Sequence, residues 1–163
     1  MKVAFYLGSK GGIQDKLIDL RTGSKYSHCE LILQTPDVPS DLFYRDIPVQ
    51  GIQTLTTDLC FSSSNRDGGT RLKWIEFKPD RWVFVDVPVN NVPGVEAKAL
   101  SLLGRRYGWA TIMNYLLPFG EHSKAGLICS EALVMALQMD GMMRDQKPWK
   151  VSPGKLYSLL GGK

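Results

Sequence analysis

The sequence has little of what a metal site or a disulfide framework requires. Its 163 residues include three cysteines and only two histidines, and no two cysteines form a CxxC pair. Structural zinc needs four ligands at characteristic spacing, so we expect no metal site. An odd number of cysteines in a chain without a visible export signal favours reduced thiols, one of which could be chemically active.

Long hydrophobic runs are also missing. No stretch approaches the roughly 18 apolar residues of a membrane span, so none is expected. The apolar stretch at Val3–Leu7 is shorter than the roughly 7–15 residues of a secretory signal, and it alternates like a strand. The sequence therefore predicts a protein that is cytoplasmic in the cell that makes it, or that leaves that cell by another route.

The charge pattern excludes little but favours no nucleic-acid partner. The net charge is +4, and the basic residues are scattered rather than gathered in a stripe with aromatic side chains. An apolar fraction of 44% with 22% charged residues is typical of globular proteins. We expect residues 1–163 to form a single domain with one core.

Hydrophobic periodicity predicts an α+β fold. Apolar residues at helical spacing indicate three helices, at Gly12–Leu20, at 93–104 and, most clearly, at Leu127–Met139. Short polar connections between the strands favour an antiparallel meander packed against a cluster of helices. Period-2 alternation predicts strands at Lys2–Leu7, Lys25–Leu33, Gly51–Ser62, Arg71–Phe77 and Arg81–Pro88.

The predicted strand at Lys25–Leu33 carries the best candidate for a general base. Alternation places Tyr26, His28 and Glu30 on one face and Cys29 on the other. Histidine exchanges protons near neutral pH, and a carboxylate two residues away on the same face can orient its ring. The alternatives are a structural histidine and a solvated glutamate.

Cys129 is the best candidate for a nucleophile. It lies in the first turn of the helix predicted at Leu127–Met139, where free backbone N–H groups and the helix dipole favour a thiolate. A thiolate at neutral pH is the nucleophile that acyl transfer needs. The alternative is a buried, inert cysteine on the apolar side of the helix.

Other reactive side chains are weaker candidates. His122 is a competing base, but it lies in a loop of small and polar residues, where histidines are usually solvated. Cys29 and Cys60 belong to predicted strands and are expected in the core. The polar stretch Ser62–Arg71 is either a ligand-binding loop or a hairpin turn.

Several short segments together resemble a known superfamily. They occur in the order Tyr26–Leu31 (YSHCEL), Ser62–Arg71, Tyr107-Gly108-Trp109, Cys129-Ser130-Glu131 and Ser152-Pro153. The set is similar to the circularly permuted branch of the papain-like NlpC peptidase/amidase superfamily. That branch includes YiiX-type and phage or prophage proteins and is related to the lecithin:retinol acyltransferase group. In it the histidine strand precedes the cysteine helix, as His28 precedes Cys129 here.

The resemblance implies a function and a set of site residues. It makes Cys129 the nucleophile, His28 the base and Glu30 the third polar residue of a hydrolase that needs no metal or organic cofactor. The implied substrate is an amide, in peptidoglycan stem peptides or a similar peptide, and the protein could be virion-associated. The family's acidic residue after the tyrosine is replaced by glycine here. The matched segments also supply candidate substrate-binding residues, namely Tyr26, Ser63, Arg71 and Tyr107.

Two further functions remain open at this point. One is an acyltransferase or thioesterase acting on lipid-like acyl groups, which would require an apolar groove beside Cys129. The other is a non-catalytic phage structural or host-interaction protein that retains the fold. In that protein Cys129 and His28 would lie out of contact or be blocked.

Overall fold

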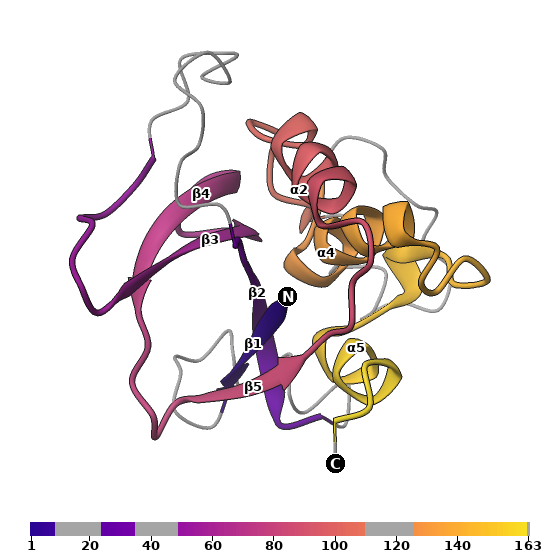
Figure 1. Ribbon diagram of the computed structural model, residues 1–163, viewed down its shortest axis with the longest axis horizontal. Coiled ribbons are helices and arrows are strands. Elements are labelled where there is room, and N and C mark those ends of the chain that lie inside the picture. The colour runs from indigo at the N-terminus through magenta and orange to yellow at the C-terminus, as the bar shows by residue number, and fades with distance from the viewer. Residues whose placement is uncertain (9–23, 35–48, 110–125, 163) are drawn as a thin grey trace.

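The computed structural model describes residues 1–8, 24–34, 49–109 and 126–162. Within them the chain is α+β, with a curved sheet along one side and the helices gathered on the other (Figure 1). The helix predicted at Gly12–Leu20 and the competing base His122 lie outside the described residues.

The sheet has five antiparallel strands in the order β4-β3-β2-β1-β5. The first four form the predicted meander, but β5 pairs with β1 and not with its sequence neighbour β4. The hydropathy of a single strand cannot show which edge of the sheet it will join. In the structure, β5 joins the edge formed by β1, where apolar side chains of the two strands are paired, such as Phe5 with Val83. The strands are β1 (Lys2–Leu7), β2 (Tyr26–Ile32), β3 (Thr57–Ser64), β4 (Gly69–Glu76) and β5 (Trp82–Asp86).

Helices α2 and α5 begin at recognisable capping residues. The Asn91 side chain accepts a hydrogen bond from the Gly94 N–H at the start of α2, and Ser152 caps α5 by accepting from the Lys155 N–H. The sequence analysis did not predict α5, because seven residues are too few to show a clear helical period. The helices are α2 (Val92–Ser101), α4 (Cys129–Leu137) and α5 (Pro153–Leu159), with 3₁₀ turns η3 (Gln138–Asp140) and η4 (Pro148–Lys150).

Helix α4 is the centre of the core. Nearly every residue in it is buried, and it packs against β2, β3, α2 and α5. The core also includes the apolar side chains of one sheet face, such as Phe5, Leu31 and Phe61, all of which are fully buried. The opposite face of the sheet carries the polar side chains described below.

Strands β2 and β3 separate at one end. They pair only through Leu31–Phe61 and Ile32–Cys60, whereas β3 and β4 pair along their whole length. Beyond the paired positions the hydroxyl of Ser62 donates to the Cys29 carbonyl at 2.6 Å. The hydroxyl of Ser63 donates to the Leu127 carbonyl, also at 2.6 Å. The segment that leads into α4 is therefore held at the gap between the two strands.

A β-bulge changes which side chains face the core at the start of β2. Tyr6 is opposite His28 and Leu7 is opposite Tyr26, so Ser27 is an extra residue. The bulge turns Tyr26 into the core, where its ring lies 5.6 Å from Phe5, and Ser27 lines the cavity on the other side. The predicted strict alternation is therefore wrong at these two positions, since a bulge leaves no hydrophobic signature.

Candidate active site

Cys129 is the first residue of α4. The preceding residue, Ile128, has an extended conformation and its side chain provides no cap. Glu131 reaches back instead and accepts a hydrogen bond from the Ile128 N–H, as the third residue of a capping box does. Burial raises the pKa of Glu131 to about 7. Because Cys129 is the first residue of α4, its thiol lies where the first-turn N–H groups of the helix favour negative charge.

Three groups on β2 contact the Cys129 sulfur. The thiol of Cys29 hydrogen-bonds to it, the His28 ring supplies a hydrogen bond and a positive charge, and the backbone N–H of Cys29 donates a further bond. Burial opposes ionisation, yet together these groups hold the pKa of Cys129 well below that of an ordinary thiol. The N–H of Cys29 is available because β3 is not paired with β2 at this position.

The imidazole of His28 contacts Cys129 and Glu30 together. Its Nε2 atom lies 2.8 Å from Oε1 of Glu30, and the ring also forms a hydrogen bond with the Cys129 side chain. Burial alone would lower the pKa of His28, but the charge and hydrogen bond of Cys129, followed by those of Glu30, raise it to about 10. Both shifts favour a thiolate and an imidazolium in this pair.

Glu30 is a buried carboxylate held by an arginine. Arg71 donates from both terminal nitrogens to the two carboxylate oxygens, at 2.6 and 2.8 Å. Burial acts to raise the pKa of Glu30, but the hydrogen bonds and charge of Arg71, with those of His28, lower it to about 2. Glu30 therefore stays ionised at 1% exposure and fixes the orientation of His28.

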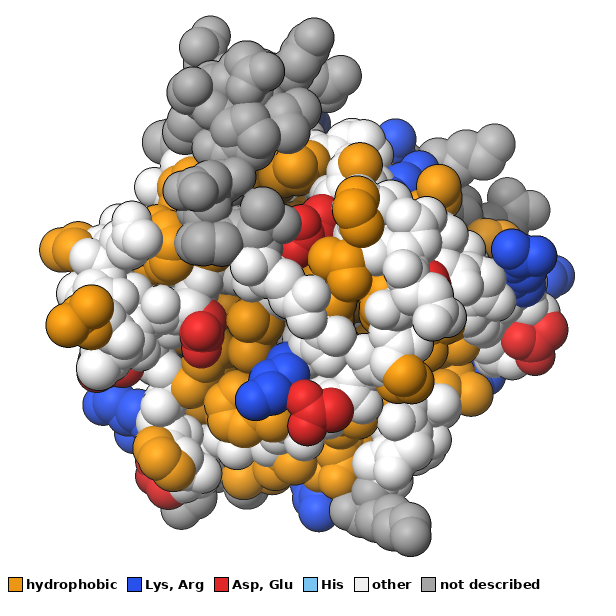
Figure 2. Space-filling view, viewed as in Figure 1, with side chains coloured by type: hydrophobic (Ala, Val, Ile, Leu, Met, Phe, Trp, Pro, Cys, Tyr) orange, Lys and Arg blue, Asp and Glu red, His pale blue; other side chains and the backbone are white. Residues whose placement is uncertain are grey.

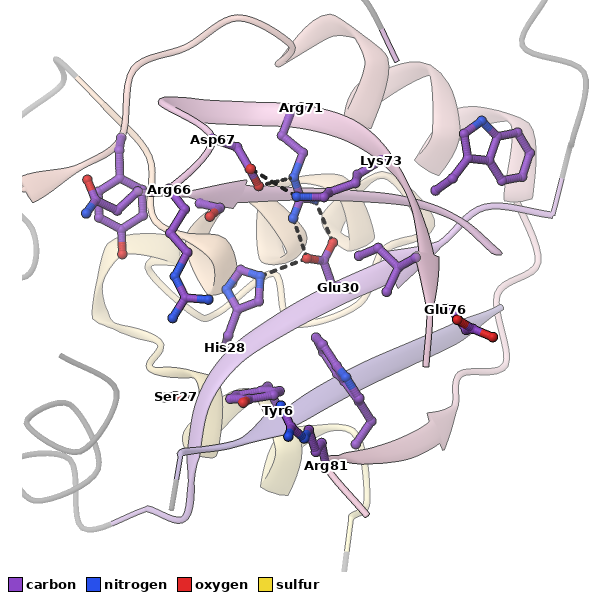
Figure 3. Close-up of a pocket in the computed structure, with 16 residues that line it drawn as sticks. Tyr6, Ser27, His28, Glu30, Arg66, Asp67, Arg71, Lys73, Glu76 and Arg81 are labelled. Atoms are coloured by element: carbon purple, nitrogen blue, oxygen red, sulfur yellow. Dashed lines mark hydrogen bonds and ion pairs between the residues drawn. The ribbon is translucent and has the colours of Figure 1, made fainter. Parts of the chain in front are cut away.

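The chain of ion pairs continues to the β3–β4 turn. Asp67 accepts from the Nε atom of Arg71 at 2.9 Å and from the Lys73 ammonium at 3.0 Å. Figure 3 shows the resulting series from His28 through Glu30, Arg71 and Asp67 to Lys73. Bidentate and shared contacts of this kind restrict the arginine to one conformation, which in turn fixes Glu30.

A cavity of about 500 Å³ lies on the polar face of the sheet beside His28. Of the four candidate substrate-binding residues, Arg71 and Tyr107 line it. The other two do not: Tyr26 packs in the core against Tyr157, and Ser63 is bonded to the backbone before α4. Their buried contacts give both a structural role.

Some residues of the site were not singled out by the sequence analysis. Asp67 and Lys73 belong to the ion-pair series, and Ser27 lines the cavity. Arg71 was singled out for contact with substrate, but its guanidinium is occupied by Glu30 and Asp67. No local pattern could have revealed these partners, because Glu30 and Arg71 come from strands that are separated by β3 in the sheet.

The described residues contain no cluster of three or more histidine, cysteine or acidic side chains able to hold a metal ion. None of the helices in this part of the chain is long and apolar enough to cross a membrane. The three cysteines are all free thiols and all buried. Figure 2 shows one face of the molecule, where acidic, basic and apolar side chains are interspersed.

Comparison of the sequence with protein-family models, with curated proteins and with solved structures found no match.

Proposed function

We propose that the protein is a cysteine hydrolase that cleaves an amide bond, with Cys129 as the nucleophile and His28 as the proton-transfer group. The observation that carries the proposal is the contact between Cys129, at the start of α4, and His28, whose Nε2 atom lies 2.8 Å from the Glu30 carboxylate. A nucleophile, a base and a third group that orients the base form the arrangement that activates thiols in acyl transfer.

The reaction would proceed through a thioester. The Cys129 thiolate attacks the substrate carbonyl, and its backbone N–H, at the start of α4, would stabilise the oxyanion. His28 then gives its proton to the leaving amine, and the C–N bond breaks. In the second half His28 takes a proton from water, which attacks the thioester and releases the acid and the thiolate.

The proposed fold is the papain-like NlpC type in permuted order. Its support is the histidine strand that precedes the cysteine helix, with α4 packed on the antiparallel sheet at β2 and β3. Polar lining of the cavity, including Lys73, Asp67 and Glu76, favours a peptide or cell-wall amide over a lipid-like acyl group. The contact of His28 with Cys129 likewise argues against a purely structural protein.

The test is Cys129-dependent amide cleavage. Purified sacculi and a mixture of short peptide amides are incubated with the protein and with Cys129→Ala, and new amines are identified by mass spectrometry. We expect products that require Cys129, together with a protein adduct on Cys129 after rapid acid quenching. The proposal fails if no product forms or if Cys129→Ala gives the same products. An added hydroxyl acceptor would reveal the acyltransferase alternative, as product transferred to the acceptor in place of free acid.

A further inference from the structure

Two thiols of the chain are in contact. The side chain of Cys29 on β2 is hydrogen-bonded to that of Cys129 at the start of α4, and both residues are buried. The proposed reaction uses the sulfur of Cys129 but gives no chemical step to the sulfur of Cys29. The thiol of Cys29 is therefore a second group able to react with sulfur, directly beside the first.

Adjacent residues of β3 hold the backbone on both sides of this contact. The Ser62 hydroxyl donates to the carbonyl of Cys29 at 2.6 Å. The Ser63 hydroxyl donates to the carbonyl of Leu127, two residues before Cys129, also at 2.6 Å. Both serines are completely buried, and α4 packs directly on β2. The contact between the two thiols thus follows from the placement of the backbone as well as from the side chains.

The third cysteine lies on the other face of the sheet. Cys60 is opposite Ile32 in the register of β2 and β3, and Ile32 is three residues beyond Cys29. Side chains an odd number of residues apart on a regular strand point to opposite faces. The Cys60 thiol instead donates to the Asp58 carbonyl. Cys60 therefore serves as a buried thiol that is placed away from the pair.

Burial restricts the oxidants that can reach the pair. Cys129 is 4% exposed and Cys29 is 0% exposed, which excludes a bulky disulfide, since exchange requires access to the sulfur. The His28 ring, which contacts Cys129, is 22% exposed and lines the cavity. Hydrogen peroxide is close to water in size and can approach past this ring. The hydrogen bond of Cys29 and the charge of His28 favour the thiolate of Cys129, the form that peroxides oxidise.

We infer that Cys129 and Cys29 form a peroxide-sensitive pair, in which Cys129 is oxidised and Cys29 then closes a reversible disulfide with it. In the first step the Cys129 sulfur attacks one oxygen of hydrogen peroxide and the O–O bond breaks. The leaving hydroxide takes a proton from His28 and becomes water, while the sulfur, oxidised by two electrons, becomes a sulfenic acid. In the second step the Cys29 sulfur attacks that sulfur, the S–O bond breaks, and hydroxide leaves as water with the Cys29 proton.

The first step makes the second easier. Burial raises the pKa of the Cys29 thiol well above its ordinary value, and the hydrogen bond and negative charge of Cys129 raise it further. The protonated sulfenic acid carries no such charge, so Cys29 ionises more readily once Cys129 has been oxidised. The disulfide then blocks the sulfur that the proposed hydrolase uses. That loss of cleavage rests on the proposed function, whereas formation of the disulfide does not.

The test follows both thiols and amide cleavage in one sample. The reduced protein, freed of reductant, is treated with a small excess of hydrogen peroxide at neutral pH, then denatured with iodoacetamide and digested without reduction. We expect a pair of peptides linked through Cys29 and Cys129, two hydrogens lighter than the free peptides together. Cleavage should fall at least about ten-fold and return to within about two-fold of its starting rate after dithiothreitol, because a disulfide is reversible.

Three variants separate the pair from general oxidation. In Cys29→Ala no second thiol is present, so Cys129 should proceed to the sulfinic and sulfonic acids, and dithiothreitol should not restore cleavage. Cys29→Ser keeps the size of the side chain and should give the same result, which guards against a packing defect in the alanine variant. Cys60→Ala is the matched control and should form the linked peptides and recover as the parent does.

The inference is overturned if peroxide oxidises Cys129 irreversibly in the parent, or if it leaves both thiols free to react with iodoacetamide. Full recovery of cleavage in Cys29→Ala would also contradict it. Linked Cys29 and Cys129 in a protein that cleaves no amide when reduced would contradict the proposed hydrolase and leave the pair standing. Cleavage by the reduced protein, with no linked peptides after peroxide, would do the reverse.

Discussion

The surroundings of Cys129 and of Cys60 differ although both thiols are buried. Cys60 lies within β3, and its thiol donates to the Asp58 carbonyl at 3.4 Å. Burial, with the negative charges of Glu30 and Asp58, raises the pKa of Cys60 far above its usual value. At Cys129 the same burial is outweighed by hydrogen-bond donors and by the positive charge of His28.

The difference shows that donors and charge, rather than burial, determine which of the two thiols has a lowered pKa. The donors at Cys129 come from two features of the fold: a helix that begins at the thiol, and a strand whose N–H groups are left unpaired by the separation of β2 and β3. Cys60 has neither, because it lies where β3 is paired with both of its neighbours. Each prediction below removes one element of this difference.

The largest effect should come from the sulfur itself. Cys129→Ala should lower amide cleavage to the uncatalysed level, a loss of at least about 10³-fold, because no other group can form the thioester. Cleavage is measured by product release under saturating substrate. Cys60→Ala is the matched control and should keep cleavage within about two-fold of the parent, since its thiol donates to the Asp58 carbonyl and takes no part in the proposed reaction. Equal losses in the two variants would remove the distinction between the two thiols.

Replacing His28 should have the next largest effect. His28→Gln removes the positive charge next to Cys129, so the pKa of Cys129 should rise, and cleavage should fall by about 10²–10⁴-fold. The pKa is read from thiolate absorbance at 240 nm against pH. In the parent protein cleavage should decline as the pH rises through about 10, where His28 loses its proton. A Cys129 pKa unchanged by His28→Gln would contradict the ion pair.

The carboxylate behind His28 should affect both cleavage and folding. Glu30→Gln leaves Arg71 as a buried charge with its main partner removed, and should destabilise the protein by about 3–5 kcal/mol in urea unfolding. It should also reduce cleavage about 10–100-fold, as loss of a supporting group does. The double variant Glu30→Gln/Arg71→Met, which removes both charges, should recover much of the stability but not the cleavage.

The pH dependence of the free energy of unfolding tests whether Glu30 stabilises the fold as a carboxylate. The pKa of Glu30 is lowered from 4.5 to about 2, so its stabilising contribution is present above pH 4.5 and is lost as the pH falls toward 2. The free energy of unfolding of Glu30→Gln should therefore change less than that of the parent across this interval. A parallel decline in both proteins would show that Glu30 is not held ionised by Arg71.

The smallest effect is expected at Cys29. Cys29→Ala removes one hydrogen bond to Cys129 but keeps the backbone N–H, and a thiol is a weak donor. The pKa of Cys129 should rise by less than in His28→Gln, and cleavage should fall by no more than about ten-fold. Absorbance titration of the two variants side by side measures the order of the two effects. The reverse order would make Cys29 the main stabiliser of the thiolate.

Much of this site follows from local sequence pattern. The placement of His28 and Glu30 on one face and of Cys29 and Cys60 in the core agrees with the structure, because period-2 alternation holds where strands are regular. A helix over Leu127–Met139, with Cys129 in its first turn, was also predicted from apolar periodicity, and α4 begins at Cys129. These features depend on neighbours within a few residues of one another.

The remaining features depend on contacts between distant segments. The bulge at Ser27, the pairing of β5 with β1 and the clamp of Arg71 on Glu30 each require knowledge of strand order and register. None changes the hydrophobic pattern of its own segment. Local pattern therefore predicts His28, Glu30 and Cys129 as candidate residues, but not the bulge or the ion-pair partners that surround them.

The most direct test of the account is the rate at which Cys129 reacts with iodoacetamide as a function of pH, with Cys60 followed in the same digest by peptide mass mapping. The account predicts that Cys129 reacts at pH 6 at a rate close to its rate at pH 9, while Cys60 stays unmodified throughout. A Cys129 rate that climbs about ten-fold per pH unit up to pH 9, as an ordinary thiol's does, would contradict it.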